Sequence, residues 1–202
     1  MSVATSQQIT IVTGLPRSGT SMMMKMLEAG GVPPLCDGQR AADSDNPNGY
    51  YEFEPVKQTK TDASWLNDAA GRAVKMVYSL LYDLPTLQTK DRTGNRPYDV
   101  LFMRRDLHEI LASQRQMLGN MQLNTDIDDA RMGQLFAREI NRFQAWLKSA
   151  DHINVLEVDY NAVARGEATP LAQINAHLGG QLDTNSMAAV VDPCLYRNRS
   201  AA

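Results

Sequence analysis

Hydrophobic residues recur along the chain in two alternating patterns, short apolar runs and longer stripes with helical spacing. The short runs, each bounded by polar or turn residues, predict strands at 9–13, 73–78, 99–103 and 153–158. Apolar residues three or four positions apart predict helices at 18–29, 107–118, 132–147 and 171–178. Because strands and helices alternate, we expect a three-layer α/β fold with a central parallel sheet of four or five strands flanked by helices.

The segments between these elements show no regular spacing of apolar residues. Residues 32–51 contain prolines, glycines and asparagines and predict a long ordered loop, a type of segment that is often functional. After Gly179 and Gly180 we expect an irregular tail. The chain shows neither an internal repeat nor a linker, so its 202 residues predict a single domain over 1–202.

Composition excludes several classes of protein. Hydrophobic residues make up 43% and charged residues 21%, as in globular proteins, and the formal charge of −3 disfavours a nucleic-acid partner. No apolar run reaches 18 residues and the first residues lack a secretory pattern, so we expect a cytoplasmic protein without stable membrane insertion. Two distant cysteines and three scattered histidines predict neither a disulfide nor a metal site. The sequence leaves the oligomeric state open.

The segment between the first strand and the first helix has the composition of an anion-binding loop. Gly14 and Gly19 permit a tight turn and a close approach to a ligand. The N–H groups of Ser18, Gly19, Thr20 and Ser21 are expected to point at the anion along the positive end of the helix dipole, with the Thr20 and Ser21 hydroxyls as further donors.

This loop departs from the GxxxxGK[ST] pattern of nucleotide triphosphatases. Thr20 stands at the lysine position, and the loop's cation is Arg17, two residues before the second glycine. The missing lysine weakens the case for ATP or GTP, because that lysine bridges the β- and γ-phosphates. An arginine instead suits a bidentate contact with an oxyanion.

The segment Gly14-Leu-Pro-Arg-Ser-Gly-Thr-Ser21 resembles the 5′-phosphosulfate loop of the P-loop sulfotransferase family. That family's second signature, a strand ending in Arg with a Ser eight residues later, corresponds to Arg105 and Ser113. The resemblance implies a P-loop-type domain whose cofactor is 3′-phosphoadenosine 5′-phosphosulfate (PAPS), with adenosine 3′,5′-bisphosphate (PAP) as product. Arg105 and Ser113 would then bind the 3′-phosphate; the alternative for Arg105 is a surface ion pair with Asp106 or Glu109.

Further roles follow from the same resemblance. Arg17 and the loop amides would hold the 5′-phosphosulfate, and Lys75, on the second strand, would assist the leaving group. Arg197 and Arg199 would close over the nucleotide, as a basic C-terminal segment does in the family; a solvated tail is the alternative. Arg104 could exchange roles with its neighbour.

The sequence says less about the acceptor of the sulfuryl group than about the cofactor. The segment 49–55 combines two carboxylates with three aromatic residues, which suits a small-molecule or lipid-like acceptor bearing a hydroxyl or amine. Glu52 and Glu54 are therefore both candidates for the catalytic base.

Two other classes of function stay open on the sequence. An ATP-dependent small-molecule kinase is favoured if Asp159, at the end of an apolar strand, binds magnesium. A non-catalytic nucleotide-binding protein is favoured if the cofactor binds and no acceptor exists. The resemblance favours a sulfotransferase, whose transfer step needs no metal.

Overall fold

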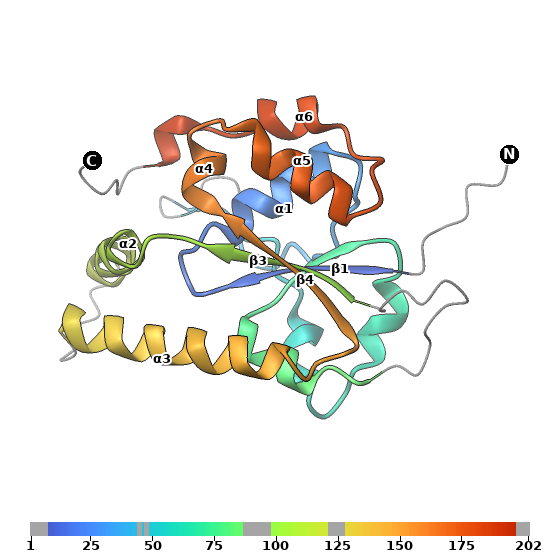
Figure 1. Cartoon of the computed structure of the whole chain (residues 1–202), viewed down its shortest axis with the longest axis horizontal. Coiled ribbons are helices and arrows are strands. Elements are labelled where there is room, and N and C mark those ends of the chain that lie inside the picture. The colour runs from blue at the N-terminus through green and yellow to red at the C-terminus, as the bar shows by residue number, and fades with distance from the viewer. Residues whose placement is uncertain (1–7, 44–45, 47–48, 87–97, 121–127, 197–202) are drawn as a thin grey trace, which may run out of the picture.

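A central sheet of four parallel strands organises the chain (Figure 1). The computed structural model describes residues 8–43, 46, 49–86, 98–120 and 128–196. Within them the strand order is β2-β1-β3-β4, and the strands are β1 Ile9–Gly14, β2 Ala73–Lys75, β3 Tyr98–Arg104 and β4 Ile153–Asp159. The predicted α/β architecture is confirmed, with four strands in the described part of the chain.

Helices cover both faces of this sheet. The α-helices are α1 Thr20–Ala29, α2 Leu107–Asn120, α3 Asp129–Leu147, α4 Tyr160–Ala164, α5 Ala168–His177 and α6 Thr184–Ala189. Four short 3₁₀ helices are η1 Glu54–Gln58, η2 Ser64–Asp68, η3 Tyr78–Asp83 and η4 Pro193–Leu195. Helices α1, α4, α5 and α6 lie above the sheet in Figure 1, whereas α3 and the segment with η1 to η3 lie below it.

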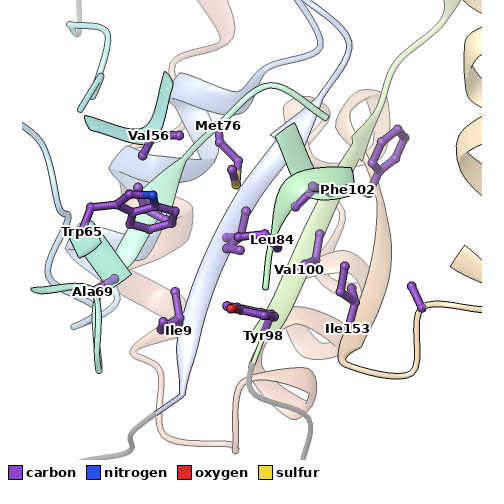
Figure 2. Close-up of a cluster of buried hydrophobic side chains, with 14 of the residues drawn as sticks. Ile9, Val56, Trp65, Ala69, Met76, Leu84, Tyr98, Val100, Phe102 and Ile153 are labelled. Atoms are coloured by element: carbon purple, nitrogen blue, oxygen red, sulfur yellow. The ribbon is translucent and has the colours of Figure 1, made fainter. Parts of the chain in front are cut away.

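Each face of the sheet carries its own apolar core. On the α3 side, Trp65, Tyr98 and Phe102 belong to one buried cluster (Figure 2). Phe143 of α3 is part of the same cluster, and its ring stacks on that of Phe102 with centroids 4.8 Å apart. On the other side, methionines of α1 pack against alternate residues of the same strands. Because both faces are covered, the inner strands are buried along nearly their whole length, which explains their mostly apolar runs.

Two regions differ from the prediction. The second strand ends at Lys75 instead of Tyr78, because the chain turns into η3 after Met76, whose N–H donates the last bond to the Val12 carbonyl at 3.1 Å. The tail after Gly180 is partly helical: the Asp183 side chain accepts hydrogen bonds from the first N–H groups of α6. Asp183 supplies the capping signal that the apolar pattern lacked.

The strand register brings the carboxyl ends of all four strands to one edge. Val12 pairs with Lys75, Gly14 with Met103, and Arg104 with Asp159. Ligands of open parallel sheets bind beyond this edge. No helix in the described residues is long and apolar enough to span a bilayer.

Candidate functional site

A cavity of about 530 Å³ lies at the carboxyl ends of the strands. Its wall combines the loop after β1, the residues that follow β2 and β3, the start of α4 and the C-terminal segment 190–196. The site residues that the sequence predicted, apart from those noted below, are part of this wall. This volume lies within the range of about 300–1,000 Å³ that is typical of small-molecule and cofactor sites.

The loop after β1 presents an uncapped helix N-terminus to this cavity. Gly19 is the N-cap of α1 with φ 95°, and no side chain caps this end of the helix. The first N–H groups of a helix have no acceptor within the helix, so this end can bind an anion. A Cβ on Gly19 would lie 2.2 Å from the Tyr160 ring, which explains why glycine is required here. Thr20 and Ser21 line the cavity, as predicted.

Ser18 differs from its predicted role. Its N–H donates to the Leu15 carbonyl at 3.2 Å within the turn, and its side chain is fully buried beside Gly14. Among the described residues its Oγ has no hydrogen-bond partner. Ser18 therefore stabilises the turn and does not line the cavity, because its N–H group is bonded to the Leu15 carbonyl and its side chain is buried.

Arg17 connects the two predicted anion motifs. Its backbone adopts φ 67°, a left-handed conformation that is uncommon outside glycine. Its Nε donates to Ser113 Oγ at 3.0 Å, and its carbonyl accepts a hydrogen bond from Arg105 Nη1 at 3.0 Å. The tertiary fold thus joins the 14–21 loop to the β3–α2 junction in one continuous wall.

Arg105 is buried and held by a carboxylate. Its Nε donates to Glu109 Oε2 at 3.0 Å, and both side chains are less than a tenth exposed. The Tyr196 hydroxyl donates to the other Glu109 oxygen at 2.8 Å, and the Tyr160 ring lies 4.5 Å from the guanidinium carbon. The ion pair that the sequence left as an alternative is therefore formed, but inside the cavity wall instead of on the surface. Arg104 is more exposed and pairs with Glu157 at 3.4 Å.

Lys75 projects from the end of β2 into the same cavity. Its Nζ donates to Ser21 Oγ at 3.4 Å and to the Tyr50 carbonyl. Burial lowers the pKa of Lys75 to about 8, since desolvation disfavours the ammonium form. At neutral pH the ammonium form of Lys75 still predominates, so this residue supplies a cation beside the 14–21 loop.

The two candidate bases lie in different places. Glu52 lines the cavity and accepts a hydrogen bond from Arg40 Nη1 at 2.9 Å. Glu54 begins η1 outside the cavity lining, and its carboxylate pairs with Lys57. The structure therefore brings only Glu52 to the site. The predicted Arg197 and Arg199 lie outside the described residues.

The long loop at 32–51 contributes residues that the sequence did not single out. The Asn46 side-chain amide donates to Ser21 Oγ at 2.9 Å, and the Arg40 guanidinium lies 3.4 Å from the centre of the Tyr50 ring. All three loop residues line the cavity, as does Tyr196. For Arg40 and Asn46 the only sequence signal was the unusual length of the loop, whereas Tyr50 belongs to the segment 49–55 that suggested the acceptor side.

The fold is similar to that of a solved sulfotransferase domain over nearly the whole chain. The sulfotransferase domain of the olefin synthase from Synechococcus PCC 7002 aligns with a TM-score of 0.56 at 14% identity, covering 97% of this chain and 89% of that one. This chain has a sulfotransferase-type fold. The sulfotransferase domain from the curacin biosynthetic pathway aligns with a TM-score of 0.49 at 12% identity, covering 94% and 89%. No protein-family model and no curated protein matches the sequence.

Within this sulfotransferase-type fold, the residue expected to bind magnesium in a kinase has a structural role. Asp159 Oδ1 accepts a hydrogen bond from the Ala162 N–H at 3.0 Å and thereby caps α4. Asp159 is not part of the cavity lining. The geometry therefore gives the kinase interpretation no support at this position.

Proposed function

We propose that the protein is a PAPS-dependent sulfotransferase that acts on a small molecule. The observation that carries this proposal is the contact between the two anion motifs, in which Arg17 bonds to Ser113 and Arg105 bonds to the Arg17 carbonyl. A nucleotide with phosphate groups at both the 3′ and the 5′ positions needs two such motifs on one cavity.

The donors on the cavity wall suit such a nucleotide. The uncapped start of α1, with Thr20 and Ser21, would hold the 5′-phosphosulfate together with Arg17. Arg105 and Ser113 would hold the 3′-phosphate. Arginine is well suited to this task because its planar guanidinium can form parallel hydrogen bonds to two oxyanion oxygens.

Two side chains have roles in the transfer step. When bound, PAPS would supply the sulfuryl group for transfer to the acceptor oxygen, with PAP left as the product. Lys75, held beside Ser21, would neutralise the charge that develops on the departing phosphate. Glu52 would accept the proton of the acceptor group.

Isothermal titration calorimetry with PAP and ATP tests this proposal. With EDTA present, PAP should bind at least tenfold more tightly than ATP, a difference of about 1.4 kcal/mol that one added charged contact can supply. Added magnesium should not reverse this order. A magnesium-dependent preference for ATP would support the kinase instead, and tight PAP binding without any acceptor would support a nucleotide-binding protein.

A further inference from the structure

The part of the cavity beyond Lys75 has an apolar wall. It is built by three separate segments, the one that includes η1, the one from the end of β2 into η3, and the C-terminal half of α2. The apolar lining residues of these segments are Phe53, Val56, Met76, Val77, Leu80 and Met117, and they outnumber the polar ones, Lys57 and Gln116. Val56 and Met76 are almost fully buried, whereas Val77 is 51% exposed and marks where the wall meets solvent.

This apolar wall limits the chemistry of the acceptor. A polyhydroxylated ligand such as a sugar would leave several hydroxyls without partners against these side chains, which is costly. An apolar chain or ring would instead remove both its own surface and that of the wall from water. A ligand with one polar end and an apolar body therefore matches the cavity, with its polar end next to Lys75.

The charges on the cavity wall disfavour a cationic polar end in the nucleotide-free cavity. The lining contains two carboxylates, Glu52 and Asp192, and six cations, Arg17, Lys25, Arg40, Lys57, Lys75 and Arg105. Arg40 pairs with Glu52, Lys57 with Glu54 and Arg105 with Glu109, and Asp192 accepts a hydrogen bond from the Cys194 N–H at 2.8 Å. With these partners included, cations still outnumber carboxylates around the nucleotide-free cavity, so an alkylammonium ion would enter a region of positive potential there.

We infer that the acceptor is an uncharged alcohol with an apolar body, whose hydroxyl lies near Lys75 and Glu52 and whose body lies along the apolar wall toward Val77. This inference rests on the proposed function and narrows it, since both hydroxyl and amine acceptors were open on the sequence. A bound alcohol loses its proton only during transfer, so it carries no charge into the cavity.

Calorimetry with a series of straight-chain alcohols tests the inference without any turnover. The protein is titrated with 1-butanol, 1-hexanol and 1-octanol, both alone and saturated with PAP. Each added CH₂ should tighten binding about fourfold, which corresponds to about 0.8 kcal/mol for a buried methylene. In the titration without PAP, hexylamine, which is charged at pH 7, should bind at least tenfold more weakly than 1-hexanol.

Substitutions in the apolar wall supply the controls. Leu80→Gln and Met117→Gln should each weaken 1-octanol binding at least fivefold and leave PAP affinity unchanged, which also shows that the variants are folded. Leu135→Gln, at a 40% exposed leucine of α3 outside the cavity, should change neither affinity.

Two results would overturn the inference: affinity that does not rise with chain length, or hexylamine that binds as tightly as 1-hexanol. Weak PAP binding with an intact chain-length dependence would count against the proposed function alone, because the alcohol series is also measured without the nucleotide.

Discussion

The Nε of Arg17 lies 3.0 Å from the Oγ of Ser113, although the two residues are 96 positions apart in the chain. Arg17 belongs to the turn before α1, and Ser113 lies two turns into α2. The hydrogen bond fixes the arginine side chain against the helix that is expected to bind the 3′-phosphate. The two proposed phosphate sites therefore lie side by side on one wall, and a substitution in one should alter the other.

The assignment of Arg105 predicts a selective loss of PAP affinity. Arg105→Ala should weaken PAP binding roughly 10- to 150-fold, since a hydrogen bond to a charged group contributes about 1.5–3 kcal/mol. Binding of adenosine 5′-monophosphate should change much less, because that ligand lacks the 3′-phosphate. Calorimetry with both nucleotides measures the ratio. Ser113→Ala should show the same selectivity with a smaller loss, since it removes a neutral hydroxyl.

Two further variants separate binding from folding in this experiment. Arg105→Ala leaves the buried Glu109 without its cation, which destabilises the fold. The double variant Arg105→Ala/Glu109→Gln removes that charge and should keep the same nucleotide selectivity. Arg104→Ala, at the neighbouring and more exposed arginine, should leave both affinities unchanged. Equal losses for the two nucleotides in the double variant would contradict the assignment.

The positions of Glu52 and Glu54 predict different effects on turnover. Glu52→Gln should lower kcat by two orders of magnitude or more with nearly unchanged PAP affinity, because general base catalysis contributes about 10²- to 10⁴-fold. Glu54→Gln, a matched control outside the cavity, should have less than a twofold effect. Steady-state kinetics with an accepted alcohol compares the two. Full activity of the Glu52 variant would place the base elsewhere.

The pKa of Lys75 predicts the alkaline limb of the pH profile. Because the ammonium form is needed and its pKa is lowered to about 8 by burial, kcat/KM should be constant near pH 6.5 and fall as the pH rises through about 8. Lys75→Met should lower kcat and abolish this limb. Lys148→Met, at an exposed lysine after α3, should keep the wild-type profile. If kcat/KM of the Lys75 variant still falls above about pH 8, a group other than Lys75 causes that fall.

The sequence by itself determined the strand–loop–helix unit of β1, the 14–21 loop and α1. The residues that determine this unit are close together in the sequence. A β-branched run predicts the strand, two glycines permit the tight turn, and apolar residues at helical spacing predict the helix. Arg105 and Ser113 came from the resemblance to the sulfotransferase signature, and both line the cavity. Strand alternation then predicted the parallel sheet, and the structure confirmed it.

Only the tertiary structure decided which residues of distant segments meet. Glu52 and Glu54 are alike in sequence, but the turn into η1 leaves one in the cavity and the other paired with Lys57. The contacts of Asn46 with Ser21 and of Tyr196 with Glu109 likewise join segments without any local pattern. Such contacts depend on how the loops pack against the sheet. That packing depends on the whole fold and cannot be read from any short stretch of sequence.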